Sequence, residues 1–267
     1  EFNTMQLTTP IEIPSSAVRI SPSDRLLFVG SCFADNIGRR FADNAFQATV
    51  NPYGVMYNPI SVLHTLQKIA DNDCSEQGFP YDKIIITLGT NHIYREKATG
   101  EVVDNCQKRP QKLFQEEVLG IDECAATLIQ CLEICKDKDV IFTVSPIRYK
   151  KYGFHESQLS KSTLLLAIDK IGANYFPAYE IVLDELRDYR FYAPDMIHPS
   201  EQAVDYIFER FRETYFSAEA VKFYADYQPI KQALNHKPFN PDSAEYKAFI
   251  ENAKQKLEEF KKTHLTQ

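Results

Sequence analysis

The sequence predicts an α/β fold: a three-layer α/β/α sandwich around a parallel, doubly wound sheet, followed by a C-terminal helical extension. Two observations lead to this prediction. Several short apolar runs, rich in β-branched residues, have the composition of strands covered on both faces. These runs alternate with longer segments whose apolar residues recur at helical spacing. Such alternation is typical of parallel sheets, because parallel strands are joined by helical crossovers.

The first strand is expected over residues 26–29, an uninterrupted apolar run. It stops at Gly30, which is followed by Ser31 and Cys32. From Phe33 to Ala45, apolar residues then recur every four positions and form one stripe of a helix. The stretch is therefore predicted to fold as strand, tight turn and helix.

The later elements follow the same alternation. A short strand is expected to end at Asn51, and a helix to begin at Asn58. Further strands are expected over residues 81–90, 140–144 and 175–183, and further helices near residues 122–135, 164–171 and 203–211. The charged residues 95–112 and the polar residues 148–157 are expected to be surface loops.

The length of 267 residues suits one large domain with an extension. We expect an α/β domain over residues 5–227 and a helical extension over residues 228–267. Apolar residues at near-heptad spacing between Tyr246 and Phe260 predict a helix that packs on the domain. The alternative is that this helix mediates homo-oligomerisation or binds a partner.

The formal net charge of −7 argues against nucleic acid and anionic membranes as partners, because both require clustered lysine and arginine. No apolar run approaches the length of a membrane span, and no secretory signal is visible. These features predict a cytoplasmic protein. No cofactor and no metal site is expected.

The turn at Gly30 has the arrangement of a nucleophile site. It exposes a side chain beside the N-terminus of a helix, where backbone N–H groups and positive partial charge gather. Ser31 and Cys32 can both act as nucleophiles. The plain alternative is an ordinary strand-to-helix connection with a glycine turn and a buried cysteine.

Other candidate residues follow later strands of the same sheet: Gly54, Asn91, and the pair Asp195 and His198. Because the carboxyl ends of parallel strands meet at one edge, these loops are expected to converge there. An imidazole near a nucleophile can act as a general base, and a carboxylate on its other nitrogen fixes the tautomer.

Together these residues resemble the SGNH/GDSL hydrolase superfamily. More closely, the chain is similar to the GSCFA-domain family, through Gly30-Ser31-Cys32-Phe33-Ala34. The resemblance covers roughly residues 24–215 and implies a flavodoxin-like sheet of the SGNH-hydrolase type. It also implies that Gly54 and Asn91 form an oxyanion hole, and that Asp195 and His198 complete a catalytic triad.

The sequence departs from the superfamily at the nucleophile. In register, Ser31 falls on the aspartate of the Gly-Asp-Ser block and Cys32 falls on the catalytic serine. Cys32 is the favoured nucleophile, with a thiol pKa expected to be lowered by the helix N-terminus and a neighbouring imidazole; Ser31 remains the alternative. His92 stands where the superfamily has an aspartate after Asn91, and either lines the pocket or has a structural role.

The resemblance implies an enzyme that hydrolyses acyl esters through a covalent acyl-enzyme, with a small-molecule or carbohydrate ester as substrate and deacetylation of a carbohydrate as one form. The alternatives are an acyltransferase onto a glycan hydroxyl, a metal-binding domain with Cys32, Asp195 and His198 as ligands, and a non-catalytic binding domain.

Overall fold

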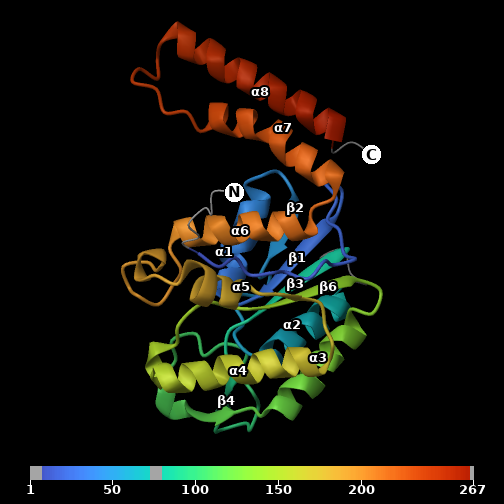
Figure 1. The fold of residues 1–267 in the computed structure, drawn as a ribbon, viewed down its shortest axis with the longest axis vertical. Helices are drawn as coiled ribbons and strands as arrows, with labels where there is room; N and C mark the ends of the chain where they lie inside the picture. Colours follow the sequence, from blue (N-terminus) through green and yellow to red (C-terminus); the bar gives the residue numbers. More distant parts are fainter. Residues whose placement is uncertain (1–7, 73–79, 265–267) are drawn as a thin grey trace, which may run out of the picture.

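The computed structural model describes residues 8–72 and 80–264. Its centre is a five-stranded sheet in the order β2-β1-β3-β6-β7, with all strands parallel (Figure 1). The strands are β1 (Arg25–Gly30), β2 (Gln47–Val50), β3 (Lys83–Leu88), β6 (Asp139–Val144) and β7 (Tyr175–Phe176). The predicted parallel, doubly wound sheet is confirmed. Its strand order reverses between β1 and β3, the place where such sheets bind ligands.

Helices cover both faces of the sheet, which completes the predicted three-layer sandwich. Residues of β1 alternate between the two cores: Leu26 and Phe28 face one side, and Leu27 and Val29 the other. On the first side lie α1 (Cys32–Ala42) and α6 (Glu201–Tyr215), and on the second lie α2 (Pro59–Asn72), α3 (Ile121–Ile134) and α4 (Phe154–Lys170) (Figure 1).

The strand predicted over residues 175–183 is present only in its first two residues. Only Tyr175 and Phe176 pair with β6, and the chain then turns at Pro177 into α5 (Ala178–Glu180) and a π-helical turn (Ile181–Leu186). Proline has no N–H to donate to a sheet ladder, so pairing stops there. Ile181 and Val182, which suggested a strand, are buried in the first core, but they lie in a helical turn.

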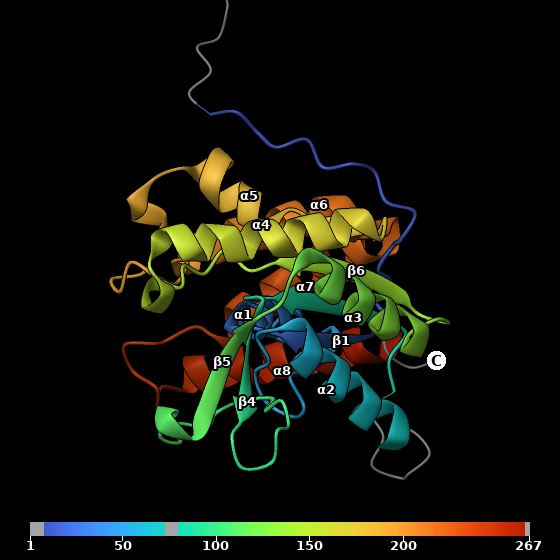
Figure 2. The ribbon, with the colours of Figure 1, turned by 90° about the horizontal axis from the view of Figure 1, so that it is seen from below.

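The predicted loop over residues 95–112 is wrong at its start, where Arg95 and Glu96 belong to the first strand of an antiparallel hairpin. Its strands are β4 (His92–Glu96) and β5 (Phe114–Val118), which lie outside the central sheet (Figure 2). Charged side chains hide the strand pattern in the sequence. Arg95, which is opposite Gln115, forms a diagonal ion pair with Glu117 on the other strand. The loop predicted over residues 148–157 is shortened likewise, because α4 begins at Phe154.

Two helices form the C-terminal end of the chain, α7 (Ala218–Leu234) and α8 (Ala244–His264), and they lie beyond α6 (Figure 1). They pack together through Phe223 and Phe260, whose ring centroids are 4.8 Å apart. Helix α7 runs through residue 228, so the domain boundary expected there stays a prediction, as does a role of α8 in homo-oligomerisation. The expected domain start at residue 5 lies outside the described residues. No helix in the described ranges has both the length and the apolar character of a membrane span.

Candidate active site

The turn after β1 separates the two candidate nucleophiles. Gly30 has a φ of +141°, and a side-chain carbon added there would lie 2.1 Å from the carbonyl oxygen of Thr87 on β3. Ser31 is fully buried and caps α1, because its Oγ accepts a hydrogen bond from the N–H of Phe33. Cys32 is the first residue of α1, and it is half-buried and free. The turn therefore leaves the thiol, and not the hydroxyl, within reach of a ligand.

The expected lowering of the Cys32 pKa is wrong. Burial raises the pKa of the thiol to about 11, and the nearby Asp35 carboxylate adds to the rise. Three weaker effects lower this pKa without overcoming the effect of burial: the N–H groups of Cys32 and Phe33, and the charge of Lys161. Cys32 is consequently a thiol at neutral pH, and its attack on a carbonyl requires a proton acceptor.

Asn51 fixes this turn from the end of β2. Its side-chain oxygen accepts a hydrogen bond from the N–H of Gly30 at 2.8 Å, and its amide nitrogen donates to Asp35 Oδ1 at 2.6 Å. From the sequence, Asn51 is expected only as the end of a strand. Its position at the carboxyl edge, beside the glycine turn, is the signal that could have identified it.

Gly54 and Asn91, the residues expected in the oxyanion hole, have other hydrogen-bond partners. The N–H of Gly54 donates to the carbonyl oxygen of Asn51 at 2.8 Å. The side-chain amide of Asn91 donates to the carbonyl oxygen of Leu119 at 2.7 Å. Within the described ranges, no hydrogen bond joins either residue to Cys32, so their oxyanion role stays a prediction.

Asp195 and His198 form the expected acid–imidazole pair. His198 Nδ1 lies 2.6 Å from Asp195 Oδ2, and Asp195 Oδ1 accepts hydrogen bonds from the backbone N–H groups of Ile197 and His198. These bonds, that from the His198 N–H foremost, lower the pKa of Asp195 to about 2. The pair thus holds the imidazole in one orientation.

The pair is open to solvent, with side-chain exposures of 45% for Asp195 and 43% for His198. In the part of the chain that the structure describes, no hydrogen bond or ion pair links His198 to Cys32. The loop is tied instead to the segment after β6, where the N–H of Arg148 donates to the carbonyl oxygen of Ile197 at 3.1 Å. The next residue along, Tyr149, reaches the Cys32 turn, as described below.

His92 lies on β4 beside a cavity of about 220 Å³. Its Nδ1 is 2.8 Å from Glu116 Oε1, and its ring stacks on Tyr152 at a centroid distance of 3.8 Å. The same cavity is lined by Tyr57 and Tyr149, both of which interact electrostatically with Cys32. Cys32 itself is not one of the described residues that line the cavity.

Two residues near Cys32 are absent from the sequence-based candidates. Tyr149 comes from the segment after β6, and a side-chain carbon added at Gly89 would lie only 2.4 Å from its Oη. Lys161 is 1% exposed on α4, and its Nζ donates to the carbonyl oxygen of Gly89 at 2.5 Å. Lys161 precedes Leu164 by three positions, so a lysine on an apolar helix stripe was the available signal. No pattern distinguishes Tyr149 in its polar loop.

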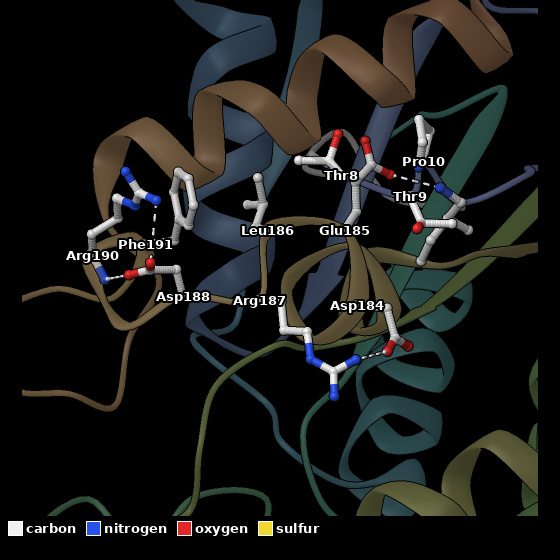
Figure 3. A pocket seen from close by; sticks show the side chains of 11 residues that line it. Thr8, Thr9, Pro10, Asp184, Glu185, Leu186, Arg187, Asp188, Arg190 and Phe191 are labelled. Carbon is white, nitrogen blue, oxygen red and sulfur yellow. Dashed lines mark hydrogen bonds and ion pairs between the residues drawn. The ribbon is translucent and has the colours of Figure 1, made fainter. Parts of the chain in front are cut away.

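A larger cavity, of about 1000 Å³, lies elsewhere (Figure 3). It is enclosed by the extended residues 8–11 and by residues 184–191 other than Tyr189. Glu185, which is 4% exposed, is already bonded to the N–H of Ile11 and to the hydroxyl of Tyr206. None of the lining residues follows β1, β2 or β3, so this cavity is separate from the candidate site. Among the described residues, no three His, Cys, Asp or Glu side chains are grouped as a metal site would require.

Comparison with family models decides the relationship of the chain. The model of the GSCFA family matches residues 25–83 and 74–211. The chain belongs to the GSCFA family. A second model, described as "GSCFA domain protein, C-terminal domain", matches residues 227–266.

The pentapeptide that names the family forms the turn described above. Gly30 provides the close approach to β3, Ser31 the helix cap and Cys32 the half-buried thiol. Phe33 and Ala34 are buried in the first core. In this GSCFA protein, the turn explains Gly30 and Ser31, core packing explains Phe33 and Ala34, and Cys32 is the residue left available for chemistry.

Solved structures similar to this GSCFA protein include several esterases. The psychrotrophic esterase EstA from Pseudoalteromonas sp. is 11% identical, with 72% of this chain and 96% of that chain covered and a TM-score of 0.43. A GDSL-like lipase from Bacteroides thetaiotaomicron is 14% identical, covering 74% and 90%, with a TM-score of 0.46. Axe2, an acetylxylan esterase from Geobacillus stearothermophilus, is 14% identical, covering 74% and 96%, with a TM-score of 0.44. A comparison with curated proteins gives no match.

Proposed function

We propose that this GSCFA protein hydrolyses acyl esters through a covalent acyl-enzyme on Cys32. The observation that carries the proposal is the contrast at the turn after β1, where Ser31 is buried as a helix cap and Cys32 is a half-buried thiol. The thiol lies at the first turn of α1, where backbone N–H groups can stabilise a developing oxyanion. It also lies where the strand order reverses, the usual ligand position in such sheets.

In the proposed reaction, Cys32 attacks the ester carbonyl and the alcohol leaves. Water then releases the acyl group from sulfur. His198, oriented by Asp195, is proposed to take the proton of the Cys32 thiol during the attack and to pass it to the leaving alcohol. It then takes a proton from the attacking water and returns it to the sulfur as the acyl group leaves. Gly54 and Asn91, which lie in later loops, are proposed to donate the other hydrogen bonds to the oxyanion.

The cavity lined by Tyr57, His92 and Tyr149 supports a small acyl group. Its volume of about 220 Å³ is below the ~300–1,000 Å³ of drug-sized ligand pockets. Tyrosine rings and His92 form much of its wall, and flat aromatic surfaces with polar edges suit a sugar. An acetylated carbohydrate is therefore the proposed substrate class, and Axe2 is an example of an esterase named for such a substrate.

Two single substitutions test the nucleophile. With a chromogenic acetate ester, Cys32→Ala is expected to lower kcat/KM by at least about 10³-fold, because the covalent route is lost. Ser31→Ala is the matched control at the neighbouring position. It is expected to retain most activity while losing about 1 kcal/mol of stability, because only the helix cap is removed. Loss of turnover in Ser31→Ala, with activity kept in Cys32→Ala, would contradict the proposal.

A further inference from the structure

Arg148 anchors the His198 loop, residues 193–199, to the edge of the sheet. It lies shortly after the end of β6, and its backbone N–H donates to the carbonyl oxygen of Ile197 at 3.1 Å. Its side chain reaches the same loop, because Nη1 donates to the carbonyl oxygen of Met196 at 2.9 Å. Within the described ranges, no other hydrogen bond joins residues 193–199 to a residue outside the loop. One arginine therefore supplies both of these links.

The bond from the side chain falls on the strained residue of the loop. Met196 has a φ of +58°, a left-handed conformation that residues with a side chain rarely adopt. Its N–H donates to the carbonyl oxygen of Ala193 at 2.9 Å, which closes the turn from within, but its own side chain is exposed. Such a conformation persists only where the surrounding contacts hold it. The Arg148 guanidinium is the contact that holds this turn from outside.

Three aromatic rings in turn fix the Arg148 guanidinium. Its Cζ lies 4.1 Å from the ring centroid of Phe154, 5.3 Å from that of Tyr192 and 5.6 Å from that of Tyr189. Phe154 is the first residue of α4, whereas Tyr189 and Tyr192 precede the His198 loop. A planar guanidinium can stack on rings while its N–H groups donate in the ring plane. The rings thus hold the donor in the direction of the Met196 carbonyl.

The segment that contains Arg148 also borders the nucleophile turn. Tyr149, the next residue, lies so close to Gly89 that a side-chain carbon added to this glycine would be 2.4 Å from Oη. The β-carbon of Ser31 would be 3.4 Å from the same added carbon. Two consecutive residues therefore contact the His198 loop on one side and the surroundings of the turn after β1 on the other.

We propose that Arg148 is a positioning residue that holds His198 in place for the reaction at Cys32. The inference rests on the proposed function, in which His198 takes the proton of the thiol. Arg148 acts through the Met196 carbonyl and determines where the His198 loop lies relative to the sheet edge. A displacement of about 1 Å between reacting groups can cost about 10²-fold in rate. Loss of the guanidinium should therefore lower kcat and leave substrate binding almost unchanged.

Replacing Arg148 with methionine and with lysine tests the proposal, and Arg190→Met is the matched control. Arg190 also lies over an aromatic ring, that of Phe191, but within the described ranges it makes no hydrogen bond to the His198 loop. With a chromogenic acetate ester, Arg148→Met is expected to lower kcat by about 10- to 100-fold and to leave KM within about twofold of the parent. Arg148→Lys keeps a cation that can donate to the Met196 carbonyl, and it is expected to restore kcat to within about fivefold of the parent. Arg190→Met is expected to change neither constant by more than about twofold.

Hydrogen exchange followed by peptide mass spectrometry gives a readout that does not depend on catalysis. Arg148→Met is expected to speed exchange in residues 193–199 by at least about tenfold and to leave peptides from β1 and β3 unchanged. A variant with the parent's kcat and the parent's exchange in the loop would overturn the proposal. Faster exchange throughout the chain would also overturn it, because Arg148 would then act on general stability, and a rise in KM at constant kcat would assign Arg148 to substrate binding instead. Absence of ester turnover in the parent would contradict the proposed function alone, because exchange still reports whether Arg148 holds the loop.

Discussion

Replacing Gly30 with alanine is expected to lower the free energy of unfolding by about 4 kcal/mol, the combined effect of backbone strain and a steric clash. The φ of +141° is a conformation that residues with a side chain rarely adopt. The new methyl group would also lie 2.1 Å from the Thr87 carbonyl oxygen, which accepts the hydrogen bond of the Ser31 N–H. Relief of the clash requires β1 and β3 to separate where the candidate site is built.

Gly172→Ala is the matched control for this prediction. Gly172 also has a positive φ, of +61°, but no other heavy atom lies within 4 Å of the added carbon. Its cost is expected to be about 1 kcal/mol, from backbone conformation alone. Urea denaturation of both variants measures the difference. Equal destabilisation by the two substitutions would show that the close approach to Thr87 contributes nothing.

Replacing Lys161 with methionine is expected to raise the free energy of unfolding by about 3 kcal/mol at pH 6. The pKa of Lys161 falls from 10.5 to about 7 on folding, so the folded state disfavours the ammonium by roughly 5 kcal/mol. The substitution removes this cost but leaves the Gly89 carbonyl without its donor, which offsets about 2 kcal/mol of the gain. Methionine has a similar length and suits an apolar site.

The pH dependence of this effect follows from proton linkage. Below pH 7 the lysine is protonated in both states, and the parent protein bears the full cost of the buried charge. Between pH 7 and 10.5 the unfolded chain retains a proton that the folded chain has released, so parent stability rises with pH and the advantage of Lys161→Met shrinks. Urea denaturation at pH 6, 8 and 9.5 measures this change. A difference between the two proteins that does not vary with pH would refute it.

Much of the fold could be predicted because its strands are covered on both faces and therefore appear as uninterrupted apolar runs. Residues 26–29 and 140–144 were placed in this way, and the structure pairs them with β3. Apolar runs do not identify strands where the apolar residues are buried in a helical turn, or where the side chains of a strand are charged. Ile181 and Val182 look like strand residues but lie in a buried π-helical turn, and Arg95 and Glu96 look like loop residues but belong to β4.

The candidate site was predictable where a short sequence motif marks it. Cys32 directly follows β1, and the Asp195–His198 pair stands in a proline-flanked loop well beyond the last strand, β7. Lys161 reaches the same place from the middle of α4, across a distance in sequence that no local pattern encodes. The direction of the Cys32 pKa was mispredicted for a related reason: burial depends on tertiary packing, and it outweighs the helix N-terminus.

The central claim is that Cys32 carries the acyl group, and peptide mapping of a trapped intermediate tests it most directly. His198→Ala is expected to slow release of the acyl group by water, because the proposed acid–base group is missing. This variant, incubated with an activated acetate ester and quenched in acid, is digested and mapped by mass spectrometry. The account predicts a single acetyl group on the thiol of Cys32. An acetyl group on Ser31, or acetylation of the chain at neither residue, would contradict it.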